Sequence, residues 1–358
     1  MSNRISSVII STGSYLPKNI IKNSEFLTSR FYEKTGEFIN RANSEVISKF
    51  QDITEIEERL YADEDHLASD LGYFAAKDAL EKNLIDPESL DYIIVAHNFG
   101  DIPLGTTRTS VLPTLASRVK NKLGIVNPDC VAYDLPFGCP GWLQGMIQAD
   151  YYIKSGDAKR ILVIGTETLS RVTDPHDRDS MIFADGAGAT ILEGTTEGTA
   201  GIISHKTQTH THKEAYYLYT EKTSNPDFKS NELYIKMDGR KIYEYALINV
   251  PLVIKSAIDK AGFKISDVKK VLVHQANGKM DEAILKRLFK LYGVLDIPEN
   301  VMPMTIAKLG NSSVATIPTL LDLIVGGKME NQEINKGDVI VFASVGAGMN
   351  INALVYKY

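Results

Sequence analysis

Cys139 is the residue of this chain with the clearest potential for covalent chemistry. It is preceded by Phe-Gly and followed by Pro-Gly, which places the thiol on a sharp turn. Pro140 fits the first position of a helix, and the apolar residues 142–153 predict that helix. Free N–H groups and the helix dipole at such a position favour the thiolate. We therefore interpret Cys139 as a nucleophile, the alternative being a buried cysteine that serves as a small apolar side chain.

Three other segments supply groups that could act together with a thiol. His274 ends an apolar strand, so its imidazole is expected to project from the edge of a sheet into a crevice. Asn311 lies between a glycine turn and a predicted helix. Residues 343–349 form a glycine loop whose backbone N–H groups can approach a substrate closely. Taken singly, each has an ordinary structural interpretation: a satisfied histidine, a helix cap and a tight turn.

Weaker signals predict no further chemistry. His205, His210 and His212 could suggest a metal site, but no cysteine or dense carboxylate cluster accompanies them. We therefore expect a solvent loop there and no metal. Residues 185–188 outline a phosphate loop without its Gly-Lys-Ser/Thr ending, which favours tight packing near a sheet or dimer edge. Cys130 is expected to be buried and inert.

The chain presents the same order of elements twice. Residues 78–97 predict a helix end, a short loop and an apolar strand, and residues 256–274 repeat that order. Such a long repeat exceeds a solenoid unit, so we predict two similar α/β halves. A second pair of segments, 155–165 and 335–343, agrees with it at a similar separation. The predicted halves are residues 1–197, with the thiol, and residues 198–358, with His274 and Asn311.

Apolar strands alternate with helices in both halves, which predicts a layered α/β architecture. The strands that we expect to be buried on both faces are 92–96, 161–164, 271–273 and 339–343. Helices are predicted at 67–82, 142–154, 243–260, 279–292 and 317–325. Two polar segments are interpreted as irregular insertions or flaps, residues 30–50 and 205–232.

Composition narrows the class of protein. The chain has 358 residues, of which 44% are apolar and 23% charged, as in globular proteins with a sizeable core. A net charge of −6 argues against nucleic-acid binding. The first ten residues hold no long apolar segment, and no stretch reaches the roughly 18 apolar residues of a membrane span. With only two cysteines, a reducing, cytoplasmic location is expected.

Together these segments resemble β-ketoacyl-acyl carrier protein synthase III, a condensing enzyme of the thiolase superfamily. The resemblance covers almost the whole chain in consistent order. It implies a thiolase-like α/β fold whose duplicated halves form five layers, α-β-α-β-α, usually in a homodimer. It implies no cofactor. The motifs that carry it are Asp134…Cys139-Pro-Gly, His274-Gln-Ala-Asn277, Gly310-Asn-Ser-Ser313, residues 183–189 and Gly346-Ala-Gly348.

The resemblance also implies catalytic roles. Cys139 would take an acyl group from a thioester, with an oxyanion hole formed by the N–H groups of Cys139 and Ala347. His274 and Asn311 would bind the second thioester and stabilise its enolate as carbon dioxide leaves, because fixed donors lower the barrier to charge development. Asn277 and Ser313 are expected to support these residues rather than to react.

Positions that usually grip coenzyme A differ in this chain. Residues 50–59 lack the Trp and the upstream Arg that normally sandwich adenine in the family. Glu244 stands where the family generally has a phosphate-facing Lys, and Asp238 adds a second negative charge. A carboxylate near a phosphate is repulsive, so the usual coenzyme A pose is doubtful. Three cations are candidates to compensate: Arg171, Arg240 and Lys241.

The expected acyl pocket has unusual walls. Phe137 replaces a small residue before the nucleophile, and Val345 occupies a position often held by Phe. Leu112 matches a residue that closes the pocket of the partner subunit in this family. These differences suggest a primer other than acetyl. The candidate substrate-binding residues are Leu112, Phe137, Arg171, Gly239, Asn277, Val345 and Gly346.

The predicted helix after His274 carries a basic side. The resemblance favours docking of an acidic acyl carrier protein there, in place of or beside acyl-coenzyme A thioesters. The alternative is an ordinary solvated helix surface. The residues concerned are Lys279, Lys286, Arg287 and Lys290.

These interpretations converge on an acyltransferase. We predict a Claisen condensation between an acyl group held on Cys139 and a malonyl- or β-ketoacyl-thioester, in fatty acid, polyketide or aryl-lipid biosynthesis. One alternative is a specialised dialkylresorcinol-type ketosynthase that joins two acyl thioesters. Others are an enzyme like hydroxymethylglutaryl-coenzyme A synthase and a non-catalytic partner subunit. A type III polyketide synthase shares the Cys-His-Asn set, but the His-Gln-Ala-Asn sequence favours the first reading.

Overall fold

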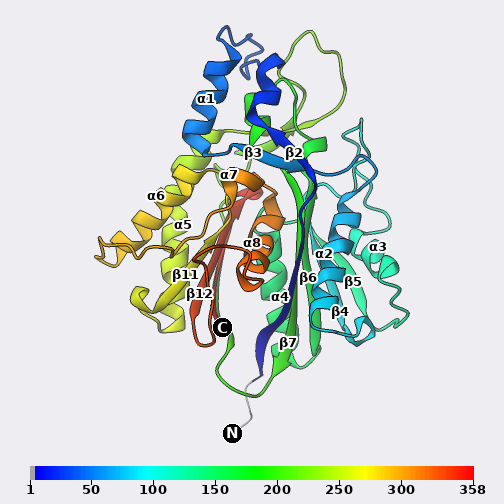
Figure 1. Cartoon of the computed structure of the whole chain (residues 1–358), viewed down its shortest axis with the longest axis vertical. Helices are drawn as coiled ribbons and strands as arrows, with labels where there is room; N and C mark the ends of the chain where they lie inside the picture. The colour runs from blue at the N-terminus through cyan, green and yellow to red at the C-terminus, as the bar shows by residue number, and fades with distance from the viewer. Residues whose placement is uncertain (1–4) are drawn as a thin grey trace.

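Two mixed β-sheets form the frame of the molecule, which the computed structural model describes over residues 5–358 (Figure 1). The first sheet has five strands in the order β1-β7-β6-β4-β5, and the second has four in the order β11-β12-β13-β8. The first comprises β1 Ser6–Tyr15, β4 Tyr92–Ala96, β5 Val131–Leu135, β6 Arg160–Thr168 and β7 Asp185–Thr195. The second comprises β8 Gly201–Thr209, β11 Val268–Val273, β12 Val339–Gly346 and β13 Asn350–Lys357. Residues 1–4, which begin the N-terminal segment considered above, lie outside the described residues.

The two sheets share one pairing pattern. In the first, β4 runs parallel to β6, and β7 and then β1 follow with antiparallel pairing. In the second, β11 runs parallel to β12, and β13 and then β8 follow in the same manner. This repetition confirms the internal duplication that the sequence predicts. The chain crosses between the sheets after Thr195 and before Gly201, while the division between residues 197 and 198 stays a prediction.

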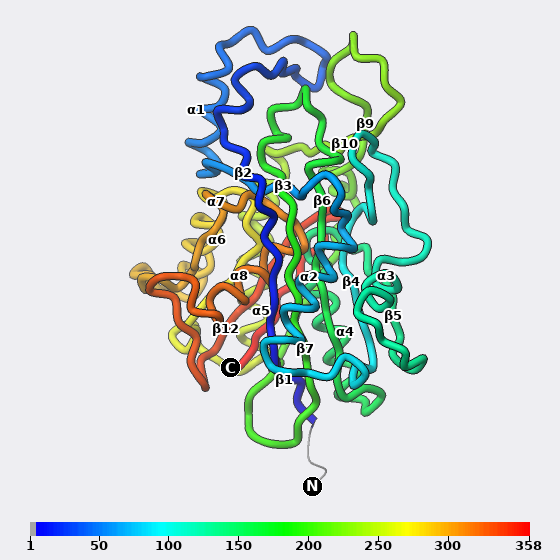
Figure 2. The backbone as a smooth tube through the Cα atoms, turned by 45° about the vertical axis from the view of Figure 1, so that its right-hand side comes forward, coloured from blue at the N-terminus to red at the C-terminus, as the bar shows by residue number. Residues whose placement is uncertain are grey.

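Helices occupy three layers around and between the sheets (Figures 1 and 2). α2 and α3 cover the outer face of the first sheet, and α5 and α6 cover that of the second. α4 and α8 lie between the sheets, where Trp142 and Leu320 share one core with Val163 and Phe342. The α-β-α-β-α order confirms the predicted fold class. These helices are α2 Ala68–Lys82, α3 Leu115–Lys122, α4 Gly141–Ser155, α5 Gly239–Ala261, α6 Gly278–Leu291 and α8 Thr316–Val325.

The central strands are buried on both faces, as their apolar runs predict. Residues 161–164 of β6 and 340–342 of β12 have no exposed surface, because helices cover both sides of each sheet. β4 coincides with the strand predicted at 92–96, and the five predicted helices occur with their ends shifted by a few residues.

A cap of shorter elements lies beyond one end of the sheets, at the top of Figures 1 and 2. It contradicts the expectation that residues 30–50 and 205–232 are irregular. α1 begins within the first segment because Val46, Ile47 and Phe50 recur at helical spacing and share a core with Phe31. β8 extends into the second segment. The cap includes α1 Asn43–Thr54, β2 Asn19–Lys22, β3 Glu58–Tyr61, β9 Leu218–Glu221, β10 Tyr234–Met237 and the short α7 Ile306–Leu309 beneath them.

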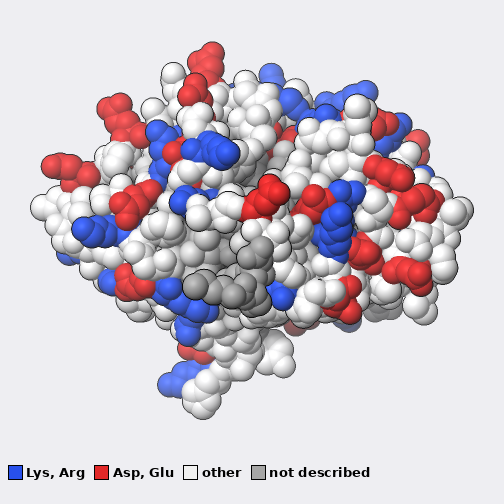
Figure 3. Space-filling view, turned by 90° about the horizontal axis from the view of Figure 1, so that it is seen from below, with Lys and Arg blue, Asp and Glu red and all other residues white. Residues whose placement is uncertain are grey.

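Charged side chains of both signs are mixed on the face seen from below in Figure 3. No continuous basic stripe crosses that face, which agrees with the net charge of −6. None of the helices in residues 5–358 combines the length and apolarity needed to cross a bilayer.

Candidate active site

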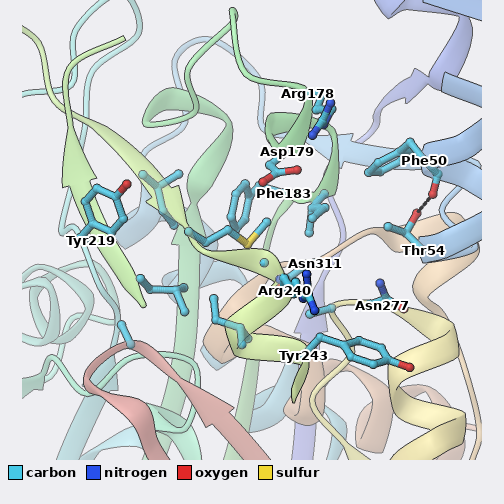
Figure 4. Close-up of a pocket in the computed structure, with 18 of the residues that line it drawn as sticks. Phe50, Thr54, Arg178, Asp179, Phe183, Tyr219, Arg240, Tyr243, Asn277 and Asn311 are labelled. Atoms are coloured by element: carbon cyan, nitrogen blue, oxygen red, sulfur yellow. Dashed lines mark hydrogen bonds between the residues drawn. The ribbon is translucent and has the colours of Figure 1, made fainter. Parts of the chain in front are cut away.

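A cavity of about 1690 Å³ brings the three predicted catalytic side chains together. Its wall is largely apolar and comes from both halves of the chain and from the cap, as Figure 4 shows for part of the lining. Cys139 comes from the turn before α4, His274 from the end of β11, and Asn311 from the turn after α7. Three distant segments of sequence thus meet in one chamber.

The Cys139 thiol is half-buried at the start of α4. Its Sγ accepts a hydrogen bond from the Ser313 hydroxyl at 3.2 Å. Burial nevertheless raises the pKa of the thiol to about 11; the Ser313 hydrogen bond opposes this rise, and the nearby Glu167 adds to it. The expectation of a thiolate favoured by the helix start is therefore wrong, because desolvation outweighs the hydrogen bonds from Ser313 and from the Cys139 backbone N–H. The thiol must lose its proton as it attacks.

Two glycines let the Cys139 turn touch the loop after β12. A Cβ atom at Gly346 would lie 2.5 Å from the Cys139 nitrogen, and one at Gly138 would lie 2.9 Å from the Ala347 nitrogen. Gly138 also has a φ of +68°, which residues with a side chain seldom adopt. The N–H groups assigned by resemblance to the oxyanion hole therefore belong to two loops in direct backbone contact.

His274 presents a neutral imidazole. It follows β11, its N–H donates to the Ala343 carbonyl at 2.8 Å, and it is 6% exposed. Burial lowers the pKa of the ring to about 4. The ring Nδ1 is buried and has no hydrogen-bond partner within residues 5–358. A neutral ring can donate one hydrogen bond and accept another.

Asn311 is held so that its amide nitrogen is the free end. Its Oδ1 accepts from the Ser313 N–H at 2.8 Å. Its backbone bonds to Ile182 and Ala184, with the N–H donating at 3.0 Å and the carbonyl accepting at 2.9 Å. Because the carbonyl end of the amide is occupied, the NH₂ group is available to a substrate oxygen in the cavity.

Gln275 ties the His274 and Asn311 loops together. It is fully buried, and its Oε1 accepts from the N–H groups of Thr305 and Ile306 at 2.8 and 3.0 Å. Those residues begin the turn of α7 that leads to Asn311. Asn277 lines the cavity, but its Oδ1 caps α6 by accepting from the Met280 N–H at 3.0 Å. Its side chain therefore has a structural task, and its support of His274 and Asn311 stays a prediction.

The structure divides the predicted substrate-binding residues. Gly239, Asn277, Val345 and Gly346 line the cavity. Leu112, Phe137 and Arg171 are outside its lining, and Leu112 is 84% exposed. A contact of Leu112 with a partner subunit's pocket stays a prediction.

The expectation that Arg171 compensates for missing phosphate contacts is wrong. Its guanidinium is buried and donates to the backbone carbonyls of Ile102, Asp63 and His66 at 2.6, 3.0 and 2.5 Å. Those bonds join the segment before α2 to the loop of Ile102, and they leave the cation outside the cavity lining. The sequence shows that residue 171 is a cation, but it does not show which backbone carbonyls accept its hydrogen bonds.

The charges at residues 238–244 pair with one another. Arg240 Nε lies 2.9 Å from Glu244 Oε1, and Lys241 Nζ lies 2.9 Å from Asp238 Oδ2. This end of the cavity is therefore less acidic than its carboxylates alone suggest. Exposed pairs of this kind are screened by water and hold their partners only weakly, so both cations remain candidates for a phosphate.

The four basic residues predicted for carrier docking are all exposed on α6. Lys286 pairs with Glu282 at 2.5 Å, and Arg287 donates to the Leu247 carbonyl at 3.3 Å. Docking stays a prediction. His205 lies on β8 against Tyr151 rather than in a solvent loop, and Cys130 is buried, as expected.

Sequence reasoning missed two acids at the site. Asp179 points its carboxyl into the cavity near Phe183 (Figure 4), and burial raises its pKa to about 6. Glu167 lies on β6 behind Cys139 and is 1% exposed. Asp179 occurs in an ordinary acidic segment, so its sequence gave no signal. Glu167 was detectable as a lone acid within an apolar strand.

Comparison with known proteins gives one consistent result. Residues 133–211 match the family described as 3-oxoacyl-[acyl-carrier-protein (ACP)] synthase III, and residues 258–358 match its C-terminal part. A Staphylococcus epidermidis protein named β-ketoacyl-[acyl-carrier-protein] synthase III is 33% identical over 347 residues, 97% of both chains.

Solved structures agree with the sequence matches. The 3-oxoacyl-[acyl-carrier-protein] synthase III of Aquifex aeolicus has a TM-score of 0.79 at 30% identity, covering 98% of this chain and 100% of that one. The Thermus thermophilus β-ketoacyl synthase III has a TM-score of 0.79 at 28% identity, covering 98% of this chain and 99% of that one.

Proposed function

Because this chain belongs to the 3-oxoacyl-[acyl-carrier-protein] synthase III family of condensing acyltransferases, we propose that Cys139 holds the acyl group and that His274 and Asn311 activate the second thioester. The observation that carries these assignments is the convergence of the three side chains on one cavity. Family membership disfavours the alternatives of a hydroxymethylglutaryl-coenzyme A synthase and a non-catalytic subunit.

In the first half-reaction, Cys139 Sγ attacks the carbonyl carbon of an acyl thioester. Negative charge develops on the carbonyl oxygen, and the N–H groups of Cys139 and Ala347 are the proposed donors that stabilise it. The new S–C bond forms as the donor's C–S bond breaks, and the thiol proton passes to the departing thiolate. Covalent capture divides one difficult condensation into two easier steps.

In the second half-reaction, a malonyl thioester loses carbon dioxide and its electron pair forms an enolate. The neutral ring of His274 and the free NH₂ of Asn311 are the donors for the enolate oxygen. The enolate carbon then attacks the acyl carbon on Cys139, the S–C bond breaks, and the released Cys139 thiolate takes up a proton from water to restore the thiol. Neutral donors suit this task because they need not give up a proton.

The acyl group is proposed to be larger than acetyl. Small-molecule sites usually enclose roughly 300–1,000 Å³, and this cavity has about 1690 Å³. Val345 lines this cavity where the family often has the larger Phe, which supports the more specialised proposal that a β-ketoacyl thioester replaces malonyl, as in dialkylresorcinol-type ketosynthases. A largely apolar wall favours an alkyl chain over a polar acyl group.

The proposal is tested by mapping the acyl adduct. After incubation with acetyl, medium-chain and long-chain thioesters, we expect mass spectrometry to find the acyl mass on the peptide of Cys139. Cys130, which is 1% exposed, provides an internal control because it is expected to stay unmodified. An absence of any adduct at Cys139 across the panel would contradict the proposed role.

We also propose that α6 docks an acyl carrier protein. Lys286→Glu combined with Arg287→Glu is expected to raise KM for a carrier-bound substrate about tenfold, because rim charges steer association with an acidic partner. Turnover of the matching coenzyme A ester should be unchanged. Lys328→Glu combined with Lys336→Glu, an equal charge change on two exposed loop residues, is the control. Equal KM values for the double variant and wild type would refute docking here.

We also propose that the chain forms a homodimer and that it works in the cytoplasm. β5 is the edge strand of the first sheet, with Val131 46% exposed, and Leu112 is 84% exposed. Exposed apolar side chains at a sheet edge support association with another chain. Both cysteines are free thiols, which supports a reducing location.

A further inference from the structure

Behind the nucleophile, a fully buried carboxyl group organises a chain of hydrogen bonds. Glu167 Oε1 accepts from the backbone N–H of Asn98 at 2.9 Å and also from its side-chain amide. The same amide nitrogen, Nδ2, donates to Ser313 Oγ at 3.0 Å. Ser313 Oγ then donates to Cys139 Sγ at 3.2 Å. Four residues from three loops and one strand thus form a continuous path that ends at the thiol.

The path has a direction that follows from donor and acceptor chemistry. The backbone N–H of Asn98 requires an acceptor, so Glu167 must present an oxygen at that point. That oxygen orients the Asn98 amide with its NH₂ group toward Ser313. Because Ser313 Oγ accepts from this NH₂, its single proton is left to donate to sulfur.

We propose that Glu167, Asn98 and Ser313 act as positioning residues that aim the Ser313 proton at Cys139 and thereby stabilise its thiolate. This inference rests on the proposed role of Cys139 as the nucleophile. Hydrogen bonds to a charged acceptor are stronger than neutral ones, so the contact contributes most at the moment the thiol ionises.

The surrounding structure holds the path rigidly. His97 Nδ1 accepts from the Gly100 N–H at 3.0 Å, and its Nε2 lies 3.0 Å from Asp134 Oδ2, which fixes the loop that carries Asn98. Ser313 has a φ of +54°, a strained conformation that persists where the surroundings enforce it. Its N–H also fixes Asn311, so Ser313 positions two groups of the site.

Protonation of Glu167 leaves the donor and acceptor roles along this chain of hydrogen bonds unchanged. Burial, together with Asp185, raises the pKa of Glu167 to about 8, while the Asn98 hydrogen bonds oppose the rise. A neutral carboxylic acid still has a carbonyl oxygen that accepts hydrogen bonds. In the neutral form it also places no negative charge beside the developing thiolate.

The test measures the reactivity of the thiol directly. Cys139 is alkylated with iodoacetamide from pH 6.5 to 9 and quantified by peptide mass spectrometry. Ser313→Ala and Asn98→Leu are each expected to slow alkylation about tenfold at pH 8, because a hydrogen bond to a thiolate is lost. The double variant should be no slower than Ser313→Ala, since both changes disrupt the same hydrogen bond to the Cys139 sulfur. Glu167→Gln keeps an acceptor oxygen and should stay within about threefold of wild type.

Two results would overturn the path: unchanged alkylation in both single variants, or a double variant whose slowing is the product of the two single effects. Cys130 labelling is followed in the same digests, so a variant that unfolds is recognised by its reaction there. Asn98→Gln, which keeps the amide but displaces it, then substitutes for Asn98→Leu, with the same expected slowing. Alkylation needs no acyl donor, so failure of the proposed function leaves this test intact.

Discussion

His274→Ala is expected to retain acylation of Cys139 and to slow condensation by about 10²–10³-fold, the usual cost of losing one oxyanion donor. His274 and Asn311 lie in the cavity with Cys139, but the oxyanion hole for acylation is assigned to backbone N–H groups of other loops. Removing the ring therefore removes one donor to the enolate. The backbone donors proposed for the acylation step are still present. Single-turnover measurement of adduct formation and of product separates the two steps.

The matched control is His205→Ala, because His205 lies on β8 against Tyr151 and is absent from the cavity lining. It should leave both steps unchanged. Loss of acylation in His274→Ala would instead make the imidazole the essential base for the thiol. Since burial lowers the pKa of His274 to about 4, lowering the pH should not abolish condensation through ring protonation until the pH approaches that value.

The fold was largely predictable because its central strands are apolar without interruption. Strands as apolar as residues 92–96 and 161–164 are stable only in a sheet that is covered on both faces. The repeated order of elements predicted a second sheet of the same kind. The cap was harder to predict. α1 has most of its length exposed to solvent, and only Val46, Ile47, Phe50 and Thr54 are buried, so its polar residues resembled a loop.

The site was predictable in its chemistry but not in its electrostatics. The motifs identified Cys139, His274 and Asn311, which the fold does bring to one cavity. The pKa of the thiol could not be read from its neighbours in sequence, because desolvation depends on the whole chamber. Arg171 was misinterpreted for the same reason, since its carbonyl partners come from residues about 70 to 110 positions away.

Gly346→Ala is expected to slow acylation of Cys139 by about 10²-fold. The added Cβ would lie 2.5 Å from the Cys139 nitrogen and 2.8 Å from Pro140 Cδ. Neither atom belongs to a flexible side chain, so the two loops must separate. A misplacement of about 1 Å at reacting groups costs about 10²-fold in rate, and the overpacking itself costs about 1–3 kcal/mol of stability. Adduct kinetics and urea unfolding measure the two effects.

Gly72→Ala is the control, because it makes the same substitution at a site where the added methyl group meets no steric clash. A Cβ atom there would lie 3.4 Å from Thr166 Cγ2, an ordinary contact between α2 and β6, and alanine favours a helix interior over glycine by roughly 0.5–1 kcal/mol. It should acylate at the wild-type rate and be at least as stable. Normal acylation by Gly346→Ala would mean that the contact between the Cys139 turn and the Ala347 loop does not set the oxyanion geometry. The donors to the acylation oxyanion would then be other groups in the cavity, because the N–H groups of Cys139 and Ala347 both depend on that contact.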